Sequence, residues 1–124
     1  MKLQDLIAYQ KSVSLAMEIF EISKSFPKSE TYSLTDQIRR SSRSITANLA
    51  EAYRKRSYPK HFFSKLTDCD AENSETQVWL EFSFLCKYID KETYNKLKYP
   101  IEEIGKLINY MIRNPNKFGV KNEH

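Results

Sequence analysis

Residues 37–56, QIRRSSRSITANLAEAYRKR, carry the pattern from which the fold class follows. Their apolar side chains are three, four or seven positions apart, as in an α-helix that buries one face. We expect this helix to begin after Ser33, whose hydroxyl would cap it with Asp36 in the capping-box position, and to end near Arg56. The expected buried face is formed by Leu34, Ile38, Ile45, Leu49, Ala52 and Tyr53.

Three more amphipathic helices are expected, at about residues 5–25, 57–89 and 90–113. Ser57 is the expected N-cap of the second of these helices and Asp90 that of the third. The expected core residues, in chain order, are Leu6, Tyr9, Val13, Ala16, Met17 and Phe20, then Phe62, Leu66, Cys69, Leu80 and Phe84, then Tyr94, Leu97, Ile101, Ile104, Ile108 and Met111.

Composition favours a few long elements, because two glycines and four prolines in 124 residues provide few turns. Pro100 interrupts the last helix, which therefore either bends at Tyr99 or follows a short separate segment. Four helices with short links predict an all-α fold, an antiparallel up-down-up-down four-helix bundle over residues 1–113. Residues 114–124 lack a helical period and are expected to form a flexible polar tail.

No stretch reaches the roughly 18 to 20 apolar residues that a membrane-spanning helix needs, and the N-terminus lacks the apolar core of a signal peptide. The sequence therefore predicts a cytoplasmic protein without a membrane partner. Cys69 and Cys86 lie 17 positions apart on one expected helix, roughly 25 Å, which no disulfide can bridge. We interpret both as packed thiols in a reducing compartment.

The net charge of +4 is unevenly distributed along the chain. Residues 31–60 carry seven basic and two acidic residues, a sum of +5, whereas residues 61–90 carry two basic and six acidic residues, a sum of −4. On a helical wheel most arginines of residues 37–56 fall in one band, away from the expected buried face. The candidate nucleic-acid-binding residues in and beside this band are Arg39, Arg40, Arg43, Arg54, Lys55 and Arg56.

Two kinds of partner compete for this arginine band. Guanidinium groups donate forked hydrogen bonds that match phosphate oxygens, so outward arginines can bind the backbone of RNA or DNA. Guanidinium groups match carboxylates equally well, and Asp68, Glu72 and Glu75 form an acidic stripe on the helix expected next in the chain. The arginines can therefore also pair with carboxylates of a neighbouring helix or subunit, and the sequence leaves both interpretations open.

The second half of the helix expected at residues 57–89 is apolar on two sides. A single four-helix bundle covers one broad face of each helix, so a second apolar side predicts an interface between the subunits of a homo-oligomer. A core wider than the wheel assumes is the alternative. The candidate interface residues are Val78, Trp79, Phe82, Leu85 and Ile89.

Sequence motifs of enzyme chemistry are weak or missing. The Glu-x-x-His pairs of di-iron bundles do not occur, and the lone His61 is interpreted as a surface residue. Glu18-x-x-Glu21 and Glu72-x-x-Glu75 could hold Mg²⁺ for phosphoanhydride hydrolysis, but solvated helix faces often produce this spacing. We therefore predict no catalytic residues, no metal, no cofactor and no enzymatic activity.

The chain also resembles a known family. The matching residues are Phe26, Pro27, Tyr32, Leu34, residues 37–57, Phe62, Leu66 and the segment DCDAENSETQVWLEF at 68–82. At these positions the chain is similar to the four-helix-bundle proteins encoded within intervening sequences of bacterial 23S rRNA genes. The resemblance extends from Leu6 to about Arg113, although Ala52 and Ala71 stand where the family commonly has glycine.

This resemblance implies a bundle that assembles into a ring, commonly a homopentamer. It also implies a relation to accessory proteins of diversity-generating retroelements, which bind nucleic acid and a reverse transcriptase through a basic surface. Arg39 and Arg40 match the family's paired arginines, and Asn48 and Glu51 match positions for which we expect a structural role. We thus predict a non-enzymatic, oligomeric bundle that binds RNA or DNA phosphates. The alternative is a structural or protein-adaptor ring whose arginines pair with carboxylates between subunits.

Overall fold

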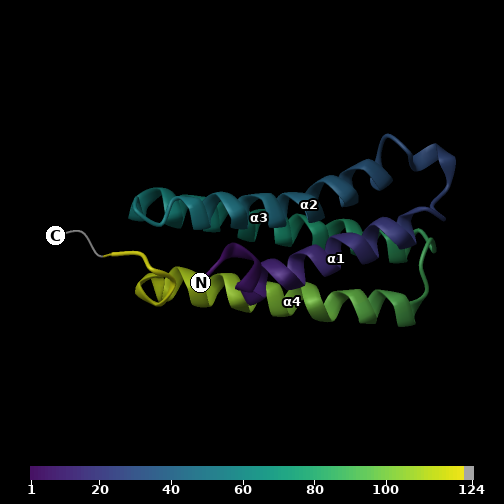
Figure 1. Cartoon of the computed structure of the whole chain (residues 1–124). Helices are drawn as coiled ribbons and strands as arrows, with labels where there is room; N and C mark the ends of the chain where they lie inside the picture. Colours follow the sequence, from purple (N-terminus) through teal and green to yellow (C-terminus); the bar gives the residue numbers. More distant parts are fainter. Residues whose placement is uncertain (122–124) are drawn as a thin grey trace.

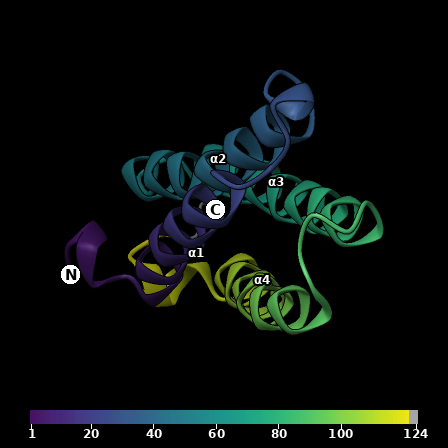
Figure 2. The same ribbon diagram turned by 90° about the vertical axis from the view of Figure 1, so that its right-hand side faces the viewer.

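The computed structural model describes residues 1–121, and this part of the chain contains four long helices and no strand. The elements are η1 (Leu3–Asp5), α1 (Ile7–Ser23), η2 (Lys28–Glu30), α2 (Leu34–Arg54), α3 (Pro59–Leu85), α4 (Lys91–Arg113) and η3 (Pro115–Phe118). Figure 1 shows consecutive helices side by side, joined by short links at alternate ends of the molecule. Each helix packs on the next and α1 also packs on α4, so α2 and α4 lie diagonally across the core (Figure 2). The all-helical fold predicted from the sequence is confirmed.

Helix α2 buries the face that its sequence predicts. All six predicted core residues are buried, and Ile38 and Ile45 are completely inaccessible to solvent. Small polar side chains complete this face, since the buried Ser41 Oγ lies 2.8 Å from Thr76 Oγ1 of α3 and the Cys69 thiol donates to the Ile45 carbonyl. Because these side chains are small and satisfied, α2 and α3 can pack closely along their length.

The core residues predicted on α3 and α4 are buried, except at the ends of the two patterns. Phe84 and Tyr94 are half-buried and stack on each other with ring centroids 4.8 Å apart. Asp90 caps α4 as predicted, because its carboxylate accepts the Thr93 backbone N–H at 2.8 Å. Helix α4 runs through Pro100 as one element, so the alternative of a short separate segment is wrong.

The buried stripe predicted for the first helix is correct at its start and wrong farther along. Leu6 is buried and Tyr9 packs against the core, but Val13 and Met17 are exposed, and α1 instead buries the side that carries Ser12 and Ser23. Both sides of α1 are apolar enough to be buried. The side with Ser12 and Ser23 is the buried one because the hydroxyls of these serines form hydrogen bonds with side chains of α2. Ser12 Oγ, for example, lies 2.9 Å from Thr46 Oγ1. The buried residues of α1 are Ala8, Ser12, Leu15, Ile19 and Ser23.

The N-terminus of α2 is capped by a residue other than the predicted one. Ser33 occupies the N-cap position as predicted, but its side chain does not cap the helix. Its hydroxyl donates to the carboxylate of Glu30, which also accepts the backbone N–H of Leu34. The Tyr88 hydroxyl donates to the second oxygen of the same carboxylate at 2.8 Å. Hydrogen bonds from Ser33, Tyr88 and Leu34 hold the pKa of Glu30 below its ordinary value of 4.5.

Both ends of α3 also differ from the prediction. The helix starts directly after Tyr58, and Ser57 does not cap it. It ends at Leu85, earlier than predicted, because Lys87 adopts a left-handed backbone conformation with φ of 65°. The next N–H, that of Tyr88, returns to a carbonyl in the last turn at 2.9 Å, which is the hydrogen bond of a Schellman ending.

The C-terminal segment packs against the bundle. Val120 is only 3% exposed, and Phe118 packs against the core beside it. Gly119 joins them in the left-handed conformation, with φ of 84°. The predicted tail without regular structure is therefore wrong for residues 115–120, and its last residues, 122–124, lie outside the described residues.

The two cysteines differ in their surroundings. Cys69 is buried in the core, and burial, followed by the charges of Asp70 and Glu72, raises the pKa of its thiol to about 12. Cys86 is exposed at the end of α3. The prediction of two packed thiols is therefore correct for Cys69 and wrong for Cys86.

Candidate nucleic-acid interface

Three of the predicted arginines line one groove on the outer side of α2. Arg39, Arg40 and Arg43 surround a volume of about 470 Å³, which we call the basic groove. Their positions i, i+1 and i+4 place them on one side of the helix, opposite the core. The other residues that line the basic groove are Thr31, Thr35, Asp36, Ser44 and Ala47.

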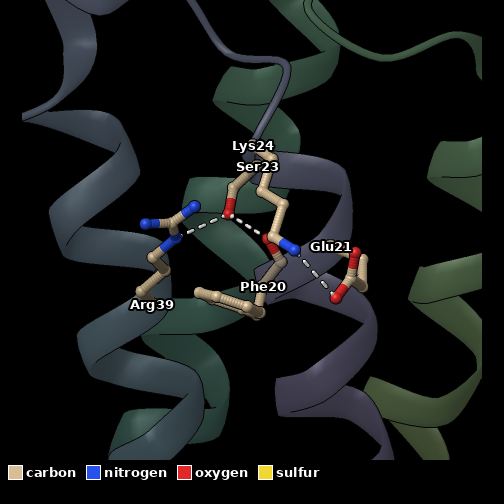
Figure 3. A network of polar contacts seen from close by, with 5 residues as sticks. All are labelled: Phe20, Glu21, Ser23, Lys24 and Arg39. Carbon is tan, nitrogen blue, oxygen red and sulfur yellow. Dashed lines mark hydrogen bonds and ion pairs between the residues drawn. The ribbon is translucent and has the colours of Figure 1, made fainter.

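An aromatic ring of α1 supports one wall of the basic groove. The guanidinium groups of Arg39 and Arg43 lie 4.8 and 5.5 Å from the centroid of the Phe20 ring, and the Lys24 ammonium lies 4.7 Å from it. Cations are attracted to the negative face of an aromatic ring. Figure 3 shows Arg39 and Lys24 around Phe20. Three cations on one ring concentrate positive charge at the edge of the groove.

A hydrogen-bond chain fixes the orientation of Arg39. Its Nε donates to Ser23 Oγ at 2.7 Å, and Ser23 Oγ donates to the Phe20 carbonyl at 3.0 Å (Figure 3). Within residues 1–121, the Arg39 side chain makes this one hydrogen bond, which uses one of its five guanidinium N–H donors. The two terminal nitrogens are therefore held in place and remain free to donate to a ligand.

Two cations at the basic groove, Arg40 and Lys24, form exposed ion pairs that neutralise them only weakly. Arg40, whose side chain is 69% exposed, pairs with Asp36 at 3.2 Å, and Lys24 pairs with Glu21 at 3.2 Å. Such surface pairs contribute roughly 0.3 to 0.5 kcal/mol, and salt screens them. Arg40 and Lys24 can therefore exchange a carboxylate for a phosphate at little cost.

The acidic stripe of α3 does not neutralise the basic groove within the described part of the chain. Glu75 accepts the Trp79 indole N–H at 3.1 Å, Glu72 accepts a hydrogen bond from Ser44, and Asp68 lies 3.9 Å from a lysine of its own helix. Partial burial, followed by the charge of Glu75, raises the pKa of Glu72. Pairing of the arginines with these carboxylates inside one chain is therefore wrong, and pairing between subunits stays a prediction.

The other three predicted residues form a second group at the C-terminal end of α2. Arg54 and Lys55 are exposed, and about 17 Å along the helix axis separate Arg54 from Arg43. The Arg56 guanidinium instead lies 3.7 Å from the Tyr53 ring centroid and donates to backbone carbonyls of Tyr53 and of η3. The predicted single band is therefore two groups, and Arg56 serves the fold by holding the C-terminal segment.

Three of the five predicted interface residues form a ridge on the surface. Val78, Phe82 and Leu85 are exposed at positions i, i+4 and i+7 of α3, and we call them the α3 ridge. Trp79 is half-buried beside the ridge, with its ring centroid 6.1 Å from that of Phe82. Ile89 belongs to the core, because the chain turns inward after α3 ends, so its prediction as an interface residue is wrong.

A groove between α1 and α2 was missed by sequence reasoning. It has a volume of about 350 Å³, and it shares Arg43 and Ala47 with the basic groove. The available signal was the second apolar side of α1, which was taken for the core side. The residues of this apolar groove are Tyr9, Val13, Ala16, Met17, Arg43, Thr46, Ala47 and Ala50.

Within residues 1–121, no cluster of three or more His, Cys, Asp or Glu side chains could hold a metal ion. The two predicted Glu-x-x-Glu pairs therefore do not come together into such a cluster. In the same part of the chain, every helix is too short or too polar to cross a membrane.

The fold and its grooves define a class of protein, a small all-helical bundle with a basic groove on an outer helix. Within that class, the chain belongs to the 23S rRNA-intervening sequence protein family, whose model matches residues 4–110. The family predicted from the sequence is thus confirmed. The chain is also similar to a crystal structure of a protein of unknown function from the S23 ribosomal protein family of Bacteroides thetaiotaomicron VPI-5482. The two share 32% identity with a TM-score of 0.80, over 89% of this chain and 98% of that one. No curated protein matches the chain.

Proposed function

We propose that the chain is an antiparallel up-down-up-down bundle that assembles into a homo-oligomer and binds the phosphate backbone of RNA or DNA through the basic groove. The observation that carries the proposal is the grouping of Arg39, Arg40 and Arg43 around one groove, with Phe20 supporting two of the three guanidinium groups. The protein acts by binding in the cytoplasm, and no catalytic step is part of the proposal.

The chemistry of the basic groove suits phosphate oxygens. A guanidinium group presents paired donors that match two oxygens of one phosphate. Because Ser23 and an aromatic ring already hold Arg39, this side chain loses less conformational freedom on binding than an unrestrained arginine. Three arginines against one lining carboxylate, that of Asp36, leave the groove a net charge of +2.

The proposal is tested by fluorescence anisotropy with a labelled RNA hairpin and a DNA duplex, titrated at several salt concentrations. Each phosphate neutralised on duplex DNA contributes about −0.9 to the slope of log K against log salt, so three arginines predict about −2.7 per bound subunit, and two predict about −1.8 where Arg43 lies in a contact between subunits. Arg40→Gln is expected to reduce the magnitude of this slope by about 0.9, and the double variant Arg39→Gln, Arg40→Gln by about 1.8.

The matched control for these variants is Arg113→Gln, which removes the same charge from an exposed position at the end of α4. It is expected to leave the slope unchanged. Absence of binding at low salt, or equal slopes for the wild type and the double variant, would show that the basic groove does not bind phosphates. Circular dichroism confirms that each variant remains helical.

A second candidate function is a structural or protein-adaptor ring in which the arginines pair with carboxylates of a neighbouring subunit. The observation that favours it is the exposed acid Glu81 on α3, which has no ion-pair partner among the described residues. Arg40→Glu separates the two candidates. It disperses the oligomer if Arg40 pairs between subunits, whereas it preserves the oligomer and weakens nucleic-acid binding if Arg40 binds phosphate.

A further inference from the structure

Among the exposed apolar surfaces of the described residues, the α3 ridge and the apolar groove differ in shape. The α3 ridge is a row of large exposed side chains, with Phe82 and Leu85 49% and 62% exposed, and Phe82 also lines a groove between α2 and α3. The apolar groove is concave, and three of its eight lining residues, Ala16, Ala47 and Ala50, have small side chains. Large side chains on a ridge and small side chains in a groove are the two halves of a close helix packing.

The two surfaces lie on different sides of the bundle. The apolar groove runs between α1 and α2, whereas the ridge faces outward from α3. Helix α1 packs on α2 and α4, which places α3 diagonally across the core from it. One chain therefore cannot cover its own groove with its own ridge.

The charges around the two surfaces are of opposite sign. Glu75 and Glu81 lie on α3 beside the ridge, three residues and one residue from Val78 and Phe82. Arg43 lines the end of the apolar groove, where it adjoins the basic groove. A ridge placed against another ridge would bring acidic side chains together, and a groove against a groove would bring arginines together. Only ridge against groove sets acid against base.

We infer that the α3 ridge of one copy of this chain docks into the apolar groove of a second copy. The contact rests on the assembly that the proposed function includes, and it specifies which two surfaces meet. Because it joins two different surfaces, each copy keeps one free ridge or groove until the assembly closes into a ring or extends as a filament. Arg39 and Arg40 line only the basic groove and stay available for phosphate.

The test uses two full-length variants whose substitutions fall on exposed side chains. Phe82→Glu places a charge in the middle of the ridge, and Met17→Glu places the same charge in the groove. Native mass spectrometry and sedimentation velocity are expected to show the wild type as an oligomer and each variant alone as a single chain. An equal mixture of the two variants still contains one intact ridge and one intact groove. It is expected to give a complex of one chain of each kind.

The control is Tyr99→Glu, which adds the same charge to a 69% exposed aromatic residue of α4 that belongs to neither surface. It is expected to keep the wild-type oligomer. Self-association of either variant alone, or a mixture that stays monomeric although both variants are helical, would overturn the contact. A monomeric wild type would overturn both the contact and the assembly, and phosphate binding by Arg40 is decided separately by the salt titration.

Discussion

Replacing Gly105 by alanine should destabilise the protein, against the usual effect of this substitution inside a helix. In a helix interior alanine is favoured over glycine by about 1 kcal/mol. At this position of α4, however, an added Cβ would lie 3.2 Å from Nδ2 of Asn73, a residue that is 5% exposed and donates to the Ile101 carbonyl at 2.9 Å. Displacing that amide leaves a buried donor poorly paired, which costs roughly 1 to 3 kcal/mol. The two effects together predict that the free energy of unfolding falls by about 1 kcal/mol.

Removing the Asn73 amide should reverse the sign of the stability change that Gly105→Ala causes. In the Asn73→Ala background the new methyl group meets no Nδ2 atom, so Gly105→Ala is expected to raise the free energy of unfolding by about 1 kcal/mol. The double-mutant cycle then gives a coupling of about 2 kcal/mol. Urea unfolding followed by circular dichroism measures all four proteins at one concentration, because assembly makes stability depend on concentration.

The control for this cycle is Lys106→Ala, on an exposed neighbour in the same helix, which is expected to change the free energy of unfolding by less than about 0.5 kcal/mol. A gain of about 1 kcal/mol from Gly105→Ala in both backgrounds would refute the reasoning, because Asn73 would then have moved without cost. Equal losses in both backgrounds would place the clash elsewhere.

Three further predictions concern other parts of the fold. Hydrogen bonds lower the pKa of Glu30, so the contribution of its carboxylate to stability is complete above pH 4.5 and is lost as the pH falls through the lowered pKa. Glu30→Gln should therefore be less stable than the wild type at neutral pH, and the difference in Tm should disappear in acid. Iodoacetamide at about pH 8 should label the exposed Cys86 and spare Cys69, whose pKa of about 12 keeps the buried thiol protonated, as peptide mass mapping would show. Val120→Ala should lower the free energy of unfolding by about 1.6 kcal/mol, the value of two buried methyl groups, and an unchanged urea midpoint would mean that the C-terminal segment does not pack.

The predictable parts of the fold are those where one face of a helix differs clearly from the rest. The buried face of α2 and the Asp90 cap of α4 follow from local pattern alone, as does the position of three arginines on one side of α2. The chosen side of α1 could not be predicted, because two apolar sides compete and the decision rests on hydroxyl pairs with another helix. Ser12 meets Thr46 across 34 positions of sequence, a contact that no local period contains.

Three other features of the structure could not be predicted, because the local sequence carries no sign of them. Lys87 ends α3 in a conformation for which glycine is the usual sign, so nothing in its side chain marks the turn. Glu30 replaces Ser33 as the cap because Tyr88, far along the chain, helps to hold its carboxylate in place. Arg56 looks like part of a surface band, but it reaches a carbonyl 62 positions away.

The corner between α2 and α3 holds both ends of the described chain. The Tyr53 hydroxyl donates to the Met1 carbonyl, and Arg56 donates to the Phe118 carbonyl. The basic groove opens farther back along α2, with Arg39 roughly 22 Å along the helix axis from Arg54. A fluorophore or affinity tag fused at the N-terminus therefore sits at the opposite end of α2 from the link between α1 and α2, and it can anchor the protein to a sensor surface with Arg39 and Arg40 still facing solution (Figure 1).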